Sequence, residues 1–548
     1  MAKRPRLRSG FTLGGEQAEA DPLLEDAFFE SSDFEVMRSK QDARCFVVGR
    51  TGSGKSAALQ RLVEIEPAHV IRINPEDLSL PYITDLQVIR YLDSLDVNLD
   101  LFWIALWKHV LLVEVIRHRY KVNSPAAKQT MMINLRERLK KDPAKEAALD
   151  YLEEFEGRFW SGTDERVREI TNILTSKIDG EMGVSVGLGG NGNAKLGAKA
   201  ATESTTQSRS EQAERYQRII NDTQLSKLNK MLSVLDEEIL DAQHFTYVVI
   251  DDLDRSWVDE RLANDLIRCL FRTVLDMKRV KHLKVLVALR TNIFQELDFG
   301  SRGGGQEEKF RSLVLQIRWT RADLEELLDE RVATAAPRVH LDIHTMAELL
   351  PNTNRTRGNP LDYMLDRTLL RPRDAIAFAN ECLALGIGKT RLTWDDIQTA
   401  ERSYSAKRLL ALRDEWKPTY PGIDRVIALF KGVPARMTRQ EFQVKLDEAM
   451  LLLSDSNFPG VLWLTRLSQS MWISNDQSTW FELYYPLTDL IYSIGFIGCA
   501  PRAAGSPIFY QDDPLYMQSA SNLEDSSYFF VHRTYHAALD VRAGRPQA

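Results

Sequence analysis

Cysteine is scarce in this sequence, and its four copies form no recognisable pattern. They lie far apart and include no Cys-x-x-Cys pair; the positions are Cys45, Cys269, Cys382 and Cys499. Such spacing supports neither a structural zinc site nor a disulfide framework. We therefore expect reduced thiols, which are typical of a cytoplasmic protein.

Long apolar runs are also missing. The most apolar window, Leu101–Ile116, is interrupted by charged residues and is too short to cross a bilayer, so we expect a buried helix there. Four basic residues near the start are followed by no apolar stretch: Lys3, Arg4, Arg6 and Arg8. This pattern predicts a disordered leader and not a secretory signal. Together these observations predict a protein without a membrane partner.

Neither sign of charge dominates the chain. The net charge is −7 over 548 residues, which argues against a surface covered by nucleic acid but leaves a local basic patch open. A chain of this length exceeds what one hydrophobic core organises, so we expect several domains. The sequence carries no signature of a nuclease, deaminase or protease.

One glycine-rich motif carries clear chemistry. Residues Gly49–Ser56 read GRTGSGKS, between an apolar run at Cys45–Val48 and a helical pattern at Ser56–Ile65. This is the P-loop pattern, in which glycines let backbone N–H groups turn toward phosphates while the lysine faces the β- and γ-phosphates. The serine hydroxyl binds Mg²⁺, and the helix N-terminus favours negative charge. The predicted nucleotide contacts are Gly49, Arg50, Thr51, Gly52, Ser53, Gly54, Lys55, Ser56 and Ala57.

An acidic cluster follows a second apolar run. Residues Thr246–Ile250 form a β-branched strand pattern that ends in Asp-Asp-Leu-Asp-Arg. A P-loop NTPase needs a carboxylate at the end of a buried strand to hold Mg²⁺, so we assign the metal to Ser56 and Asp251. Asp252 is placed to orient or deprotonate the attacking water. Asp254 either shares that role or holds Arg255.

Two further segments place polar groups beside the predicted site. A strand at Leu283–Leu289 ends in Arg290, Thr291 and Asn292, of which Arg290 and Thr291 are candidates to contact the γ-phosphate or the attacking water. The segment Leu370–Asp374 opens a helix that runs to Leu385, with proline in its first turn. Its Arg373 either turns toward the nucleotide phosphates or lies on a solvated helix start.

At the residues DDLDR the chain resembles the KAP-type P-loop NTPases of the AAA+/STAND group, and more closely a set of soluble bacterial DDLDR ATPases. The resemblance rests on Gly49–Ser56, Ile250–Arg255, Arg371–Asn380, Ala18–Phe34 and Ile317–Arg331. It implies ATP as the nucleotide, a five-stranded core, a helical lid and a homo-oligomer. It further implies an arginine acting on a neighbour's nucleotide (Arg302 or Arg311), an effector protein partner and a role in anti-phage defence. Many KAP-type proteins carry membrane helices between the two motifs, whereas this chain has the Gly-rich segment Gly183–Thr206 there.

The predicted fold class is α/β: a P-loop NTPase core with a parallel sheet and a large helical insertion at about 85–240, a helical lid, and a C-terminal α+β region. The predicted domains are a leader at 1–39, the NTPase domain at 40–335, the lid at 336–405 and the C-terminal domain at 406–548. Segment Gly183–Thr206 is either a hairpin or a flexible loop. A helix at Pro486–Ile494 followed by strands at Pro507–Gln511 and Tyr528–His532 suggests a winged helix.

These features favour an Mg²⁺-dependent ATPase that acts as an oligomerising switch or motor. The alternative is a nucleic-acid-acting ATPase that binds DNA through the winged-helix-like region. Some basic and aromatic residues there suit a nucleic-acid face but are widely scattered: Trp416, Lys417, Tyr420, Arg425, Arg436 and Arg439. A scaffold that binds nucleotide without turnover is disfavoured by the intact motifs.

Overall fold

The computed structural model divides the chain into two compact units, and each is described by itself. The sheet unit comprises residues 32–50 and 58–317, and the helical unit comprises residues 1–31, 51–57 and 318–548. The structure describes residues 6–74, 97–121, 225–253, 260–297, 310–472, 479–501 and 505–542, with scattered positions between 89 and 217. The segment Gly183–Thr206 and most of the predicted helical insertion lie outside the described residues.

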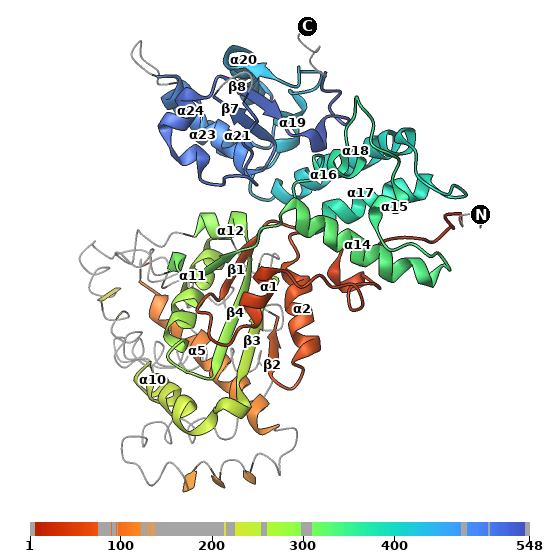
Figure 1. Ribbon diagram of the computed structural model, residues 1–548. Helices are drawn as coiled ribbons and strands as arrows, with labels where there is room; N and C mark the ends of the chain where they lie inside the picture. The colour runs from red at the N-terminus through yellow and green to blue at the C-terminus, as the bar shows by residue number, and fades with distance from the viewer. Residues whose placement is uncertain are drawn as a thin grey trace, which may run out of the picture. The chain divides into compact units, whose positions relative to one another are not determined.

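Five parallel strands form the sheet of the sheet unit (Figure 1), in the order β2-β3-β4-β1-β5. Their bounds are β1 Phe46–Gly49, β2 Val70–Ile73, β3 Thr246–Ile250, β4 Leu283–Arg290 and β5 Val314–Gln316. Nearly every residue of β1, β3 and β4 is buried, as expected for a parallel sheet covered on both faces. The apolar run at Cys45–Val48 and the strands predicted at Thr246–Ile250 and Leu283–Leu289 are therefore confirmed as strands, with bounds that differ by one residue at most.

One face of the sheet carries the main core of the sheet unit. Alternate residues such as Phe46 and Val48 in β1, or Val248 and Ile250 in β3, pack there against helices α5, α10 and α11. These helices span Asp100–Tyr120, Leu225–Val234 and Glu260–Met277, and Figure 1 shows them together beside the sheet. α5 is apolar on almost every side and is buried along most of its length, so the expectation of a buried helix is confirmed. The described residues also form helices α1 (Ser32–Arg38), α2 (Lys55–Ile65) and α12 (Thr291–Glu296) and the short helical elements η4 (Leu235–Ile239) and η5 (Ala242–His244).

A buried ion pair joins α5 to α11. The Arg268 guanidinium donates to both carboxylate oxygens of Asp100, at 2.7 and 2.6 Å, and Arg272 adds a third bond at 2.9 Å. Arg268 also pairs with Asp265 at 2.8 Å. The side chains of Asp100 and Arg268 are 8% and 6% exposed, so each charge depends on its partner for compensation.

The helical unit begins with five helices from α14 to α18: Arg321–Arg338, Met346–Leu349, Pro360–Leu365, Pro372–Leu385 and Trp394–Trp416. Reciprocal capping boxes start α14 at Thr320 and α18 at Thr393. The N-terminal segment packs into the core of these helices through Leu7, Phe11 and Leu13. The prediction of a disordered leader is therefore wrong from Leu7 onward, because apolar residues among and after the basic ones supply a buried face.

The last part of the helical unit is an α+β region with a three-stranded antiparallel sheet in the order β6-β8-β7. Its strands are Met437–Thr438 (β6), Ile497–Ala500 (β7) and Tyr528–Val531 (β8). Its helices are α19 Ile423–Ala428, α20 Arg439–Leu451, α21 Val461–Leu467, α22 Gln469–Trp472, α23 Trp480–Ser493 and α24 Ala520–Asp525.

Two local predictions in this region are corrected. The helix expected at Pro486–Ile494 begins earlier, because Thr479 and Glu482 form a capping box and Pro486 lies inside the helix. The strand expected at Pro507–Gln511 is a single bridge between Ile508 and Cys499, while the buried run Ile497–Ala500 forms the strand. Among the described residues, no helix is both long and apolar enough to cross a membrane.

Replacing Asp100 by Asn tests the buried ion pair. We expect the free energy of unfolding to fall by about 3 kcal/mol, because Arg268 stays buried with only part of its charge compensated. The matched control is Asp265→Asn, which removes a carboxylate from the same guanidinium at a site that is 30% exposed and should cost about 1 kcal/mol or less. Urea denaturation followed by circular dichroism measures both, and equal losses would contradict the assignment.

Candidate nucleotide-binding site

The carboxyl edge of the parallel sheet gathers the predicted site residues of the sheet unit. Gly49 ends β1 opposite Arg290 of β4, and Ile250, which precedes Asp251, lies opposite Val287 of β4. Because the three strands are parallel, Gly49, Asp251 and Arg290 all lie at the same edge. β4 separates the strand that leads into the glycine-rich loop from the strand that carries the acids.

The loop after β1 has the backbone that its glycines predict. Gly52 and Gly54 adopt left-handed conformations, with φ values of +79° and +92°. A Cβ atom on Gly52 would lie 2.8 Å from Cβ of Arg373, so this position also leaves no room for a side chain. α2 begins at Lys55, directly after the second left-handed glycine. The result is the strand, curled loop and helix N-terminus that bind phosphate in P-loop proteins.

Polar groups of this loop are buried in a way that suits an anionic ligand. Lys55 is only 9% exposed. The hydroxyl oxygens of Thr51 and Ser53 are buried and have no hydrogen-bond partner among the described residues. Burying such groups without partners costs free energy, and a bound polar ligand would offset this cost. The loop therefore fits a nucleotide phosphate chain.

The outer side of the loop is held by residues that follow the sheet in sequence. Trp319 donates its indole N–H to the Ser53 carbonyl at 2.8 Å. Arg371 donates from Nη1 to the Thr51 carbonyl at 2.9 Å, and the Thr51 N–H donates to Glu415 at 3.4 Å. The backbone N–H of Arg373 donates to the Gly52 carbonyl at 3.4 Å. Three of these contacts bind carbonyls of the loop and one binds the Thr51 N–H; together they hold its curled shape.

A pocket adjoins the loop and is lined by four parts of the helical unit. Its walls come from the N-terminal segment, the loop with the start of α2, one residue of α14, and the start of α17: Gly15, Glu16, Ala18, Glu19, Asp21, Leu24, Gly52, Gly54, Lys55, Ser56, Ala57, Arg331, Pro372, Arg373 and Ile376. Arg331 fixes the N-terminal wall by donating to the Leu13 carbonyl at 2.6 Å and pairing with Asp21 at 2.8 Å. Ser56 and Ala57 thus lie on the same pocket as Lys55.

Arg373 lies in this pocket with an incompletely compensated charge. Its Nε donates to the Glu16 carbonyl at 3.0 Å, and the described residues offer it no carboxylate within ion-pair distance. Burial, together with the nearby Arg371 cation, lowers the pKa of Arg373. A phosphate in the pocket would supply the missing counter-charge.

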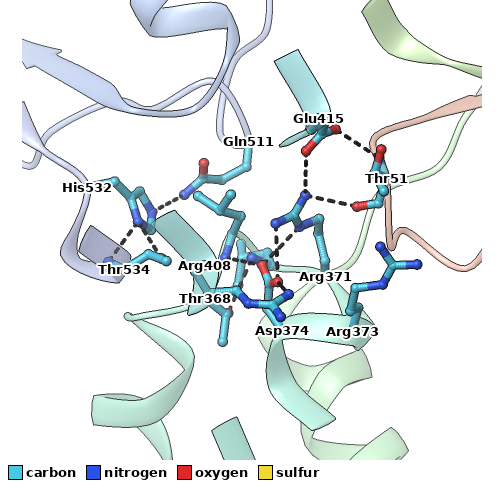
Figure 2. A network of polar contacts seen from close by, with 12 residues as sticks. Thr51, Thr368, Arg371, Arg373, Asp374, Arg408, Glu415, Gln511, His532 and Thr534 are labelled. Carbon is cyan, nitrogen blue, oxygen red and sulfur yellow. Dashed lines mark hydrogen bonds and ion pairs between the residues drawn. The ribbon is translucent and has the colours of Figure 1, made fainter. Parts of the chain in front are cut away.

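Beside Arg373 lies a buried ion network (Figure 2). Asp374 accepts from Arg371 at 2.9 and 3.2 Å and from Arg408 at 3.2 Å. Burial alone would raise the pKa of Asp374, but the two guanidinium groups outweigh burial and lower the pKa to about 2. Arg371 pairs on its other side with Glu415 at 3.6 Å, and Arg408 pairs with Glu16 at 2.7 Å. Arg371 is therefore committed to this network, whereas Arg373 faces the pocket.

The acids after β3 take up distinct positions. Asp251 is 5% exposed, and its Oδ1 accepts from the Asp252 N–H at 2.9 Å. Asp252 is partly exposed and adopts a left-handed backbone with φ of +59°, which is uncommon outside glycine, although aspartate and asparagine adopt it more often than most residues. Such a conformation is often retained at functional sites. Asp254 lies outside the described residues.

The remaining predicted residues are placed as follows. Arg50 continues the loop from Gly49 and is partly buried. Thr291 starts α12 directly after Arg290, is 7% exposed, and has a hydroxyl without a hydrogen-bond partner in the described part of the sheet unit. Arg311 is exposed, and Arg302 lies outside the described residues.

Sequence reasoning missed several residues that hold or line the site, among them Trp319, Glu415 and Glu16. Trp319 lies in a segment that supports the family resemblance, but nothing in the pattern indicates that its indole reaches the loop. Glu415 stands 364 positions from Thr51 in the sequence, and no local spacing predicts their contact.

Comparison with known proteins gives a family match, a related protein and similar solved structures. Residues 322–413 match the family model described as the FunZ-associated C-terminal helical domain, which covers the range from α14 to most of α18. Over 549 aligned positions the chain is 21% identical to the Escherichia coli (strain K12) protein named "Putative transposon gamma-delta 80.3 kDa protein", covering 96% of this chain and 67% of that protein.

Two solved structures are similar at 11% identity. A Walker-type ATPase of Pyrococcus abyssi has a TM-score of 0.34, with 84% of this chain and 91% of that chain covered. The ORC1 protein of Aeropyrum pernix, solved in complex with DNA, has a TM-score of 0.30, with 96% and 95% covered.

The sheet order, the glycine-rich loop after β1 and the acids after β3 define a P-loop NTPase fold. The predicted fold class, an α/β core with a parallel sheet, additional helices and a C-terminal α+β region, is confirmed.

Substitution of Gly52 by Ala tests the steric constraint at the loop. We expect a loss of unfolding free energy greater than about 2 kcal/mol, because backbone strain adds to the conflict with Arg373. Gly388→Ala is the matched control: its φ is +82° but the added Cβ would meet nothing within 4 Å. That variant should lose about 1 kcal/mol. Chemical denaturation compares the two, and equal losses would mean that contact with Arg373 does not matter.

Proposed function

We propose that this protein binds Mg-ATP and hydrolyses it. The observation that carries the proposal is the curled loop with left-handed Gly52 and Gly54, which leads into α2 at the buried Lys55. A helix N-terminus, a buried cation and unpartnered loop hydroxyls at one place suit a phosphate chain. The subtype suggested by the sequence, a KAP-type ATPase, belongs to this proposal.

The residues divide the work by their chemistry. Lys55 and Arg373 supply positive charge to the phosphates, while the Ser56 hydroxyl and the Asp251 carboxylate are oxygen ligands of the kind that Mg²⁺ prefers. Bound Mg²⁺ would neutralise charge on the phosphate oxygens. Asp252 orients or deprotonates the attacking water, with Asp254 as a second candidate, and Arg290 and Thr291 contact the γ-phosphate or that water.

The pocket of the helical unit offers a place for the nucleoside. Leu24, Pro372 and Ile376 provide apolar contact for a flat base, in the same pocket as Lys55 and Arg373. We place the adenine there. The preference for ATP over GTP follows from the family resemblance and is part of the proposal.

Replacing Lys55 by Ala tests nucleotide binding. We expect the Kd for Mg-ATP to rise at least about 100-fold, since a buried charge-assisted contact to phosphate is lost. Lys281→Ala, at a side chain that is 79% exposed, is the control and should bind as the wild type does. Isothermal titration calorimetry measures both, and unchanged affinity in Lys55→Ala would remove the site assignment.

The two neighbouring acids should separate binding from turnover. Asp251→Asn should weaken Mg²⁺-dependent ATP binding, because it removes a charged metal ligand. Asp252→Asn should preserve binding and lower kcat by about 100-fold or more, because the water loses its base. Asparagine tolerates the left-handed backbone of Asp252, so this change isolates the carboxylate. Phosphate release and titration are measured together; normal turnover in Asp252→Asn would shift the role to Asp254.

The alternative function, DNA binding by the C-terminal region, has topology in its favour and charge against it. The order of α19, β6, α20, α23, β7 and β8, with β8 central in the sheet, is the arrangement expected of a winged helix. However, α23, which would be the reading helix, contains no lysine or arginine. Residues 420–542 hold nine basic and thirteen acidic residues, a balance unsuited to phosphate contacts.

Three of the basic and aromatic candidates for a nucleic-acid face are also engaged within the protein. Trp416 is buried in the C-terminal core, Arg425 pairs with Asp455 at 2.5 Å, and Arg439 donates to the Ser526 carbonyl at 2.8 Å. We therefore favour a protein-directed role for this region. The oligomeric switch, the effector partner and the role in defence are proposals that rest on the family resemblance.

A further inference from the structure

We propose that Glu415, at the end of α18, is a positioning residue for the phosphate-binding loop, and that through it the C-terminal α+β region controls nucleotide affinity. This inference rests on the proposed function, because the loop must bind nucleotide for its shape to matter.

Both backbone polar groups of Thr51 are held, and they belong to the two peptide groups on either side of its Cα atom. Its N–H donates to Oε1 of Glu415 at 3.4 Å, and its carbonyl accepts from Nη1 of Arg371 at 2.9 Å. The same Nη1 lies 3.6 Å from Oε2 of Glu415, so the two charged groups also pair with each other (Figure 2). Thr51 directly precedes the left-handed Gly52, so a rotation of either peptide group would change the entry to the curled loop.

Glu415 also supplies a second negative charge to Arg371, whose other anionic partner is Asp374. The side chains of Arg371 and Glu415 are each 9% exposed, so water screens them little. Asp374 pairs with both Arg371 and Arg408, so its single negative charge is divided between two cations. Without Glu415, Arg371 would lose one of its two anionic partners while the repelled cation Arg373 remains nearby.

Local helix stability does not account for a glutamate at this position. Glu415 is the next-to-last residue of α18, where the partial negative charge of the helix end disfavours a carboxylate by about 0.3–1 kcal/mol. Its contacts with Thr51 and Arg371 offset this cost. The residue is therefore explained by the loop it reaches and not by the helix that carries it.

The same end of α18 belongs to the core of the C-terminal region. Leu412 and Trp416, on either side of Glu415, are buried among the residues of that core. Further back, the Ser405 hydroxyl donates to the Thr534 carbonyl at 2.6 Å and accepts from the Ala538 N–H at 3.0 Å. A shift of the C-terminal region would therefore move the helix end that carries the carboxylate.

The experiment compares Glu415→Ala, Glu415→Gln and Asp414→Asn in the full-length chain. For Mg-ATP we expect Kd and KM to rise about tenfold in Glu415→Ala, equivalent to about 1.4 kcal/mol, with kcat at saturation unchanged. In Glu415→Gln, Kd and KM should rise on the order of threefold, because the amide oxygen can accept from Thr51 but the neutral side chain cannot form an ion pair with Arg371. Asp414→Asn removes the neighbouring charge at a side chain that is 62% exposed and should match the wild type.

A second pair of variants tests the link to the C-terminal region. Ser405→Ala alone should raise the Kd for Mg-ATP on the order of threefold. In a protein that already carries Glu415→Ala, it should not raise Kd further, because both changes act through the contact between Glu415 and Thr51. Where Ser405→Ala does not fold, Arg533→Gln, which removes the exposed pair with Asp366 at the same junction, replaces it.

The outcomes separate the two proposals. A wild-type protein that binds no Mg-ATP overturns the proposed function. A wild-type protein that binds Mg-ATP, with Glu415→Ala binding equally well, overturns the positioning role. A fall in kcat with unchanged KM would mark a general loss of active protein and also overturn it. Additive effects of Ser405→Ala and Glu415→Ala would overturn the link to the C-terminal region.

Discussion

The hydrogen-bonding needs of the backbone between Gly49 and Lys55 determine which residues must surround this loop. A loop that turns its N–H groups toward a phosphate chain must direct its carbonyls outward, and those carbonyls need donors. Trp319, Arg371 and the N–H of Arg373 supply them at Ser53, Thr51 and Gly52. All three donors follow the last strand of the sheet in sequence, so the helices beyond β5 are part of the loop's construction.

Buried charge is the second theme of the helical unit. Asp374 is fully buried yet ionised, because Arg371 and Arg408 face it, and each of these arginines reaches a further acid. Such networks contribute little net stability, but they define which neighbour each group must have. Here the neighbours come from the N-terminal segment, the loop, α17 and α18, so the network specifies one arrangement of four separate stretches of chain.

The C-terminal region illustrates how topology and surface chemistry can disagree. Its order of helices and strands is one that DNA-binding domains use, but α23 carries aromatic and acidic residues in place of basic ones. Fold alone does not assign function, because function depends on the groups displayed. What the structure shows for this region is contact with the end of α18, through Leu412 and Trp416.

The sequence by itself determined the elements whose signals are local. The buried strands β1, β3 and β4, the loop glycines and the acids after β3 follow from runs of adjacent residues. The strand pairing in the structure places Gly49, Asp251 and Arg290 at one sheet edge. Tertiary structure decided which of Arg371 and Arg373 turns toward the pocket, that the segment from Leu7 onward packs against helices, and that Glu415 reaches Thr51. The physical reason is that charge compensation and burial depend on distances between residues hundreds of positions apart, which no local pattern encodes.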